Sequence, residues 1–197
     1  LQLKISYRLP ANVIPFVKKF MEFWSGDFNA DYIPEEQKLL KVFETCKIKW
    51  IQTNYENIEK KCFDELMNLI KEDDKSERSF ADLTYITDNE DIGLKIKNIL
   101  ESKKIECIDT YDEKKYNNQT NYNLQKRKKC YFYKGADRIK LTTLHSFKGW
   151  EGRLILVNIN KAENIEHVKL IYTALTRVKA HPEKSFLHII CTNSKLQ

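Results

Sequence analysis

The chain has 197 residues, 42% of them hydrophobic, which suits one domain with a sizeable core. Lysine and arginine outnumber aspartate and glutamate by 34 to 28, and the net charge of +6 favours polyanionic partners without requiring them. No apolar run approaches the roughly 20 residues of a membrane-spanning helix, and no apolar signal region follows a basic start. We therefore expect a cytoplasmic protein without a membrane partner. Because the chain begins with Leu1, we also expect it to be a fragment of a longer polypeptide.

Cysteine and histidine spacing gives no sign of a metal site. No two cysteines form a CxxC pair, and the histidines show no HxxxH or mixed Cys/His ligand spacing. Scattered cysteines of this kind usually fill core positions as reduced thiols. We expect no bound metal at the five cysteines, which are Cys46, Cys62, Cys107, Cys130 and Cys191.

The first part of the chain reads as helix, strand and helix. Apolar residues recur at helical spacing from Asn12 to Trp24, which predicts a helix. Ile48–Ile51 is a candidate strand, and Thr53 with Glu56 three residues later matches a capping box at the start of a helix. The apolar face of that second helix contains Ile58, Cys62, Leu66 and Leu69.

From residue 82 the chain alternates between strand and helix. Leu83–Thr87 reads as a strand, Asp88–Ser102 as a helix and Ile105–Ile108 as a strand, which together form a βαβ unit. Repeated units of this kind predict an α/β fold with three layers, in which helices cover both faces of a mainly parallel sheet. Such sheets bind ligands beyond the carboxyl ends of their strands. The later predicted elements are strands Ile139–Thr143 and Leu154–Ile159, helix Glu163–Lys179 and strand Phe186–Cys191.

Residues 111–138 form a long connection without periodicity. Basic residues crowd there beside aromatic ones, a mixture that single-stranded nucleic acid favours. A solvated basic loop leading into a strand with core aromatics is the alternative, and it is the more common origin of a charge run. The residues concerned are Lys126, Arg127, Lys128, Lys129, Tyr131, Phe132, Tyr133, Lys134 and Arg138.

The segment from residue 140 to 157 carries most of the chemistry. A predicted strand ends in hydroxyl side chains and leads into a turn with His145, Lys148 and Gly149, and Glu151 precedes the next strand. Hydroxyl, imidazole and ammonium groups, with a glycine that allows close backbone approach, suit phosphate and sugar groups at a strand end. A single histidine is more often structural, and a single glycine more often serves a turn.

This segment resembles motif V of UvrD/Rep-like superfamily 1 DNA helicases, which reads Thr-Leu-His, two variable residues, Lys-Gly, an apolar residue and Glu. Thr143, His145, Lys148, Gly149 and Glu151 occupy the matching positions. The resemblance implies that Thr143 and His145 face the DNA backbone and that Lys148 also binds the nucleic acid. It further implies that Glu151 lies at the ATP ribose and that Gly149 belongs to the ATP-binding residues. The family usually continues with an aromatic residue, whereas this chain continues with Gly-Arg.

The segment from residue 170 to 179 is similar to motif VI of the same family, a helix that contains Ala-Leu-Thr-Arg. The match makes Arg177 the arginine finger, whose permanent charge stabilises the γ-phosphoryl group during its transfer. An amphipathic helix with a surface arginine is the alternative. The match to motif V at the expected distance upstream disfavours that alternative.

Leu3–Arg8, followed by an apolar helix, resembles motif IV with its central Tyr-Arg. The resemblance implies that Tyr7 stacks on adenine and that Arg8 makes a second phosphate contact. The βαβ unit from Asp82 to Asp109 is similar to the family segment between motifs IV and V, so the resemblance covers nearly the whole chain.

Taken together, these matches imply that residues 1–197 are a single RecA-like C-terminal (2A) motor domain, in which 111–138 replace a larger inserted subdomain of relatives. No glycine fits the GxxxxGK(S/T) pattern of a Walker A loop, and no Asp-Glu pair follows a buried strand. The resemblance therefore places ATP between this chain and an N-terminal P-loop motor domain that holds Mg²⁺. That domain is expected in the same polypeptide, and together the two domains are expected to hydrolyse ATP. The isolated chain is expected to be inactive, because it lacks a Walker A motif.

The predicted function is that of an ATP-dependent helicase or translocase motor, and the DNA on which it acts is expected to be single-stranded. One alternative is a degenerate helicase-like domain that only binds nucleic acid or a protein partner. Others are an RNA-directed motor and an unrelated nucleotide-binding α/β domain. The matched Arg177 and Glu151 argue against a binding-only module, because such a module needs no arginine finger.

Overall fold

The computed structural model describes residues 9–25, 45–71, 78–111, 132 and 137–196. Its centre is a six-stranded sheet in the order β1-β6-β5-β2-β4-β3, and every pairing in it is parallel. The strands are β1 Lys47–Gln52, β2 Leu83–Thr87, β3 Cys107–Asp109, β4 Ile139–Thr143, β5 Leu154–Ile159 and β6 Phe186–Cys191. The helices are α1 Val13–Ser25, α2 Ile58–Lys71, α3 Glu90–Ser102 and α5 Ile165–Leu175, with 3₁₀ turns η2 Phe80–Asp82 and η3 Ser194–Leu196.

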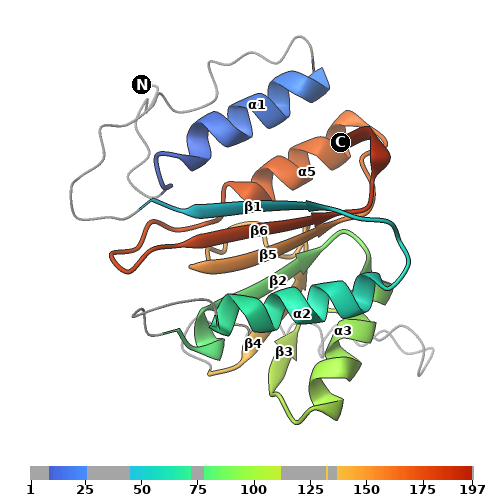
Figure 1. Ribbon diagram of the computed structural model, residues 1–197. Coiled ribbons are helices and arrows are strands. Elements are labelled where there is room, and N and C mark those ends of the chain that lie inside the picture. The colour runs from blue at the N-terminus through green and yellow to red at the C-terminus, as the bar shows by residue number, and fades with distance from the viewer. Residues whose placement is uncertain (1–8, 26–44, 72–77, 112–131, 133–136, 197) are drawn as a thin grey trace.

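The helices form two layers around the sheet. Helices α1 and α5 cover one face, and α2 and α3 cover the other (Figure 1). This arrangement confirms the predicted three-layer α/β fold, with a sheet that is wholly rather than mainly parallel. Within the described ranges, no helix combines the length and apolar character needed to cross a bilayer.

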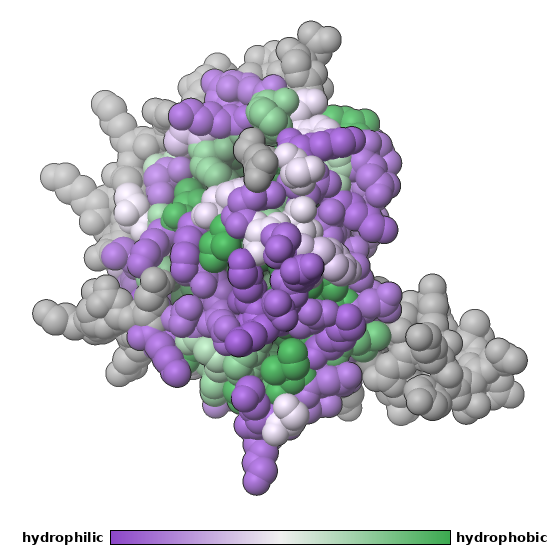
Figure 2. All heavy atoms as spheres, turned by 45° about the vertical axis from the view of Figure 1, so that its right-hand side comes forward, coloured by the Kyte–Doolittle hydropathy of each residue, from purple (hydrophilic) through white to green (hydrophobic). Residues whose placement is uncertain are grey.

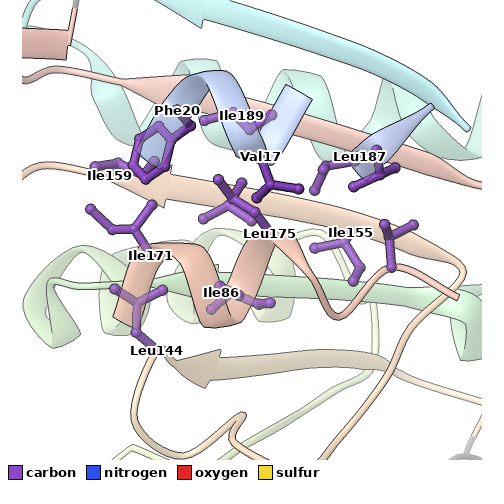
Figure 3. Close-up of a cluster of buried hydrophobic side chains, with 14 of the residues drawn as sticks. Val17, Phe20, Ile86, Leu144, Ile155, Ile159, Ile171, Leu175, Leu187 and Ile189 are labelled. Atoms are coloured by element: carbon purple, nitrogen blue, oxygen red, sulfur yellow. The ribbon is translucent and has the colours of Figure 1, made fainter. Parts of the chain in front are cut away.

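Each face of the sheet has its own apolar core. Every residue of β5 and β6 is buried, which explains why both sequences are nearly continuous apolar runs. Figure 3 shows Val17 and Phe20 of α1 and Ile171 and Leu175 of α5 in one cluster with side chains of β5 and β6. The alternate residues of the strands face α2 and α3, among them Leu83, Tyr85, Leu154, Leu156, Phe186 and Ile190.

The start of α2 differs from the sequence prediction. The helix begins at Ile58 rather than directly after Thr53, so the predicted capping box is wrong. Asn57 adopts a φ of 60°, which interrupts any helix that starts earlier. The Thr53 amide instead continues the β1–β6 ladder by donating to the Cys191 carbonyl at 2.9 Å.

Two further boundaries shift for similar local reasons. Helix α3 begins at Glu90 rather than Asp88, because the Asn89 side chain accepts from the amides of Asp91 and Ile92 as the N-cap. Strand β3 begins at Cys107 rather than Ile105, because Lys104 has a φ of 59° and ends the helix in a turn. The helix that begins the described chain starts at Val13, within one residue of its predicted start.

The predicted connection from 111 to 138 is described only at its ends and at Phe132. Tyr111 is fully buried and packs against Gly93 of α3. Phe132 is buried too, edge-on to Trp150 with ring centroids 5.3 Å apart. The alternative of a core aromatic is therefore confirmed for Phe132, and the remaining basic and aromatic residues up to 136 lie outside the described residues.

A buried charged cluster ties α2 to the sheet. The Oε1 atom of Glu65 lies 2.7 Å from both Lys49 Nζ of β1 and His188 Nδ1 of β6. Burial raises the pKa of Glu65, but the hydrogen bonds and charges of Lys49 and His188 outweigh burial and hold that pKa below its ordinary value. The stabilising contribution of the carboxylate is therefore present above the unfolded pKa of about 4.3 and is lost as the pH falls.

Replacing the buried carboxylate should destabilise the fold. We expect Glu65→Gln to lower the free energy of unfolding by about 2 kcal/mol at pH 7, because it removes the carboxylate that pairs with Lys49 and contacts the buried His188 ring. Urea denaturation measures this change. The exposed neighbour Asp64 provides the matched control, and Asp64→Asn should change stability by less than about 0.5 kcal/mol. Equal stabilities of the two variants would contradict the assigned role.

Candidate functional site

The connection from 144 to 153 carries most of the sequence-predicted site residues. Because β4 and β5 are parallel, this connection starts at the carboxyl edge of the sheet and returns to the amino edge. Leu144 and Phe147 anchor it in the core under α1 and α5. The Thr143 hydroxyl accepts from the Ser146 amide at 3.2 Å, and the Thr143 carbonyl accepts from the Phe147 amide at 3.0 Å. Thr143 thus shapes the turn that follows β4.

The same turn presents two polar side chains to solvent. His145 and Lys148 are both exposed, next to the carboxyl end of β4. Gly149 closes the turn with a φ of 94°, a conformation that side chains rarely adopt, although an added Cβ would meet no atom within 4 Å. Position 149 therefore favours glycine because of its backbone conformation, and not because a side chain would clash with neighbouring atoms.

The far end of the connection lies beside the end of α5. The Gly152 amide donates to the Arg177 carbonyl at 3.1 Å, and the Lys179 amide donates to the Gly152 carbonyl at 2.9 Å. A Cβ at Gly152 would lie 3.1 Å from Ile155 Cγ1 and 3.3 Å from a Thr84 hydroxyl oxygen, so this position has little room for a side chain. The two backbone bonds bring Glu151 next to the segment that contains Arg177.

Arg177 lies just beyond the helix and not within it. The predicted helix Glu163–Lys179 is wrong at its end, because α5 stops at Leu175. The Thr176 hydroxyl donates to the carbonyls of Tyr172 and Thr173, each at 3.0 Å, and so closes the last turn. The half-buried Arg177 then pairs through its backbone with Gly152.

Tyr172 reports on the electrostatics around the end of α5. Burial raises the pKa of the Tyr172 phenol, and the positive charge of Arg177 opposes that rise. The charge of the Arg177 guanidinium therefore acts on the Tyr172 hydroxyl. This field favours negative charge near the same point.

Arg153 fixes the amino edge on which these residues lie. Its side chain is 8% exposed and pairs with Asp82 at 3.3 Å and with Glu183 at 2.9 Å. Its Nε atom also donates to the Lys184 carbonyl at 3.1 Å. These contacts join the starts of β2, β5 and β6. The Gly-Arg pair that departs from the motif V pattern therefore has a structural role here.

The structure separates the predicted residues into two groups. Thr143 and His145 lie at the carboxyl edge of the sheet, whereas Glu151 and Arg177 lie at the amino edge. Strands of five or six residues place these edges about 16–20 Å apart. The expectation of one site beyond the carboxyl ends of the strands is therefore wrong for Glu151 and Arg177. The chain returns to the amino edge before it enters β5, and this return places both residues at the opposite edge of the sheet. Tyr7 and Arg8 lie outside the described residues.

A polar network that the sequence analysis missed lies between the carboxyl ends of β2 and β5. The Oδ2 atom of Asp88 accepts from the amides of Asn160 and Lys161, each at 2.7 Å. Its Oδ1 atom accepts from Asn160 Nδ2 at 2.6 Å. Burial raises the pKa of Asp88, although these hydrogen bonds oppose the rise. An aspartate directly after a buried strand, which the analysis assigned to a helix, was the signal for this network.

The fold of the chain is similar to that of a known structure, although its sequence matches no known family model. No protein-family model matches the chain, and no curated protein matches it. The chain is similar to a solved structure, the C-terminal domain of a possible DNA helicase from Lactobacillus plantarum WCFS1, with a TM-score of 0.53 and 14% sequence identity. The match covers 98% of this chain and 92% of that chain. At this identity the likeness shows a shared fold over nearly the entire length.

Proposed function

We propose that this chain is the C-terminal motor domain of an ATP-dependent DNA helicase of the UvrD/Rep-like type. The observation that carries the proposal is the backbone bridge between Gly152 and the residues after α5. It brings together Glu151 and Arg177, which belong to two separate motifs of that resemblance. The similar fold of a domain described as part of a possible DNA helicase supports the same assignment.

The amino edge has the chemistry that a nucleoside triphosphate needs. A carboxylate suits ribose hydroxyls, and a permanently charged guanidinium suits phosphate oxygens, so Glu151 and Arg177 have the chemistry to contact the sugar and the phosphates of one nucleotide. ATP supplies the phosphoanhydride bond, and its Mg²⁺ belongs to an N-terminal P-loop domain, proposed to be part of the same polypeptide. Arg177 stabilises the negative charge of the γ-phosphoryl group, and Tyr7 and Arg8 are assigned adenine and phosphate contacts by resemblance.

The carboxyl edge has groups suited to a DNA backbone. His145 and Lys148 are exposed there, and both can donate hydrogen bonds to phosphate. Thr143 holds the turn that presents them. One continuous segment, 144–153, joins this carboxyl edge to the amino edge, where the nucleotide is proposed to bind. A movement of the amino edge on ATP binding or hydrolysis can therefore reach the DNA contacts through a short, packed connection.

Strand displacement tests the proposal. The complete polypeptide should displace a labelled strand from a forked DNA duplex when ATP is present, and not with a non-hydrolysable analogue. His145→Ala should slow displacement about tenfold, because it removes a phosphate contact from the DNA edge. Lys19 is exposed and lies on α1, outside the 144–153 connection, so Lys19→Gln serves as the control. A polypeptide that binds DNA without ATP-dependent displacement would support the binding-only alternative.

A further inference from the structure

An open hollow lies at the carboxyl ends of β1 and β6, on the same edge of the sheet as His145. Its volume is about 570 Å³. Gln52 and Thr53 form one side at the end of β1, and Thr192 and Ser194 form the other after β6. Figure 2, which brings the right-hand side of Figure 1 forward, shows a mainly hydrophilic surface with small separated apolar areas.

The hollow is lined by hydrogen-bonding groups and one cation. Lys61 is exposed, and its ammonium group donates to the Thr53 hydroxyl, which orients the charge toward the hollow. Gln52 Nε2 donates to the Asn193 carbonyl at 2.9 Å and fixes the opposite wall. Among the described residues that line the hollow, none is acidic. This combination of hydroxyl, amide and ammonium groups suits a phosphate.

An exposed aromatic ring follows the hollow in the chain. Tyr55 comes directly after Asn54 of the lining, and 55% of its surface is exposed. Its hydroxyl accepts from Asn89 Nδ2 at 3.2 Å, which holds the ring near the start of α3. The nearby carboxylate of Glu59 is neutralised by Lys95 at 2.7 Å. A fixed and exposed ring beside a cationic hollow is the combination on which single-stranded nucleic acid stacks.

Hydrogen bonds connect this hollow to the DNA edge proposed above. The Thr192 hydroxyl donates to Asn160 Oδ1 at 3.1 Å, and Asn160 Nδ2 donates to Asp88 Oδ1 at 2.6 Å. The Leu144 amide then donates to the Thr87 carbonyl at 3.0 Å. Polar groups therefore run along the carboxyl edge from the end of β6 through β5 and β2 to the turn that contains His145.

We infer that single-stranded DNA follows this edge, with one base stacked on Tyr55 and a backbone phosphate at Lys61. The hydroxyls of Thr53 and Ser194, which also line the hollow, complete the phosphate contact. The inference rests on the proposed function, which assigns DNA to the His145 turn, and extends the track across the sheet to β1 and β6. It predicts a binding surface longer than the motif V turn alone.

Fluorescence anisotropy with a labelled oligodeoxythymidine of about 15 nucleotides tests the inference on the complete polypeptide without ATP. Tyr55→Ala should weaken binding about tenfold, whereas Tyr55→Phe, which keeps the ring but loses the hydrogen bond from Asn89, should retain most of the affinity. Lys61→Gln should weaken binding and reduce the slope of log affinity against log salt by about 0.7, the value for one phosphate contact on a single strand.

The matched controls lie on α1, which covers the α5 face of the sheet. Phe23 is an exposed ring and Lys19 an exposed cation, so Phe23→Ala and Lys19→Gln should leave affinity and salt slope unchanged. Circular dichroism melting verifies that each variant is folded. If folded Tyr55 and Lys61 variants kept full affinity for DNA while His145→Ala lost affinity, the inference would be overturned and the proposed function would stand. Absence of binding by the unmodified protein would overturn the inference together with the DNA part of the proposed function.

Discussion

Arg177→Ala in the complete polypeptide is expected to lower kcat for ATP hydrolysis about a thousandfold or more while sparing most nucleotide binding. The reason is that a guanidinium stabilises charge that develops only as the γ-phosphoryl group is transferred, and arginine fingers contribute about 10³–10⁵ in rate. A steady-state ATPase assay and binding of a fluorescent ATP analogue measure the two quantities separately.

Arg177→Lys provides the matched comparison. A lysine keeps the charge but lacks the planar fork, so it should recover only part of the lost rate. The Arg177 backbone bonds to Gly152 and Ala174 do not depend on the side chain, so both variants should remain folded. If Arg177→Ala kept an ordinary turnover rate, Arg177 would be a surface residue at the end of α5 and not an arginine finger.

Gly93→Ala should destabilise the fold by about 2 kcal/mol. A Cβ at Gly93 would lie 2.3 Å from Tyr111 Cζ and 2.5 Å from its hydroxyl oxygen, so the buried ring must move. Alanine favours a helix by about 1 kcal/mol over glycine, but overpacking a buried contact this close costs about 3 kcal/mol. The cost of the clash exceeds the gain in helix propensity, so Tm should fall by several degrees, about 2–4 °C for each kcal/mol lost.

A second substitution separates the clash from the helix effect. Tyr111→Leu should remove most of the additional cost of Gly93→Ala in a double-mutant cycle, because the smaller side chain leaves room for the methyl group. Asn98 lies exposed on the same helix, so Asn98→Ala should be neutral or slightly stabilising. Additive effects at positions 93 and 111 would show that their contact does not determine the cost.

The centre of the sheet could be predicted from the sequence because strands β2, β5 and β6 are wholly buried. The runs LILVNI of β5 and FLHIIC of β6 are nearly wholly apolar, and the helices between strands show clear periodicity. Helix ends were less predictable, because they depend on single residues. Asn57 and Lys104 adopt positive φ angles at such ends. Asparagine favours this conformation more than most residues do, but lysine does not, so only the first of these ends carried a signal in the sequence.

The candidate site was only partly predictable. The residues of the two motifs were assigned by their order in the sequence and remain a prediction, whereas their division between opposite edges follows from the parallel return of the chain after β4. The backbone bridge at Gly152 joins segments 26 residues apart, from 152 to 178, and has no signature in the local sequence. The hollow between β1 and β6 likewise unites residues from the two ends of the fold.

The central claim is that this chain supplies the second half of a DNA-dependent ATPase. ATP hydrolysis should therefore be measured for this chain alone, for the P-loop domain alone and for the polypeptide that contains both, each with and without single-stranded DNA. We predict hydrolysis that needs both halves and rises when DNA is added. Full DNA-stimulated activity of the P-loop domain alone, or no activity of the complete polypeptide, would contradict the account.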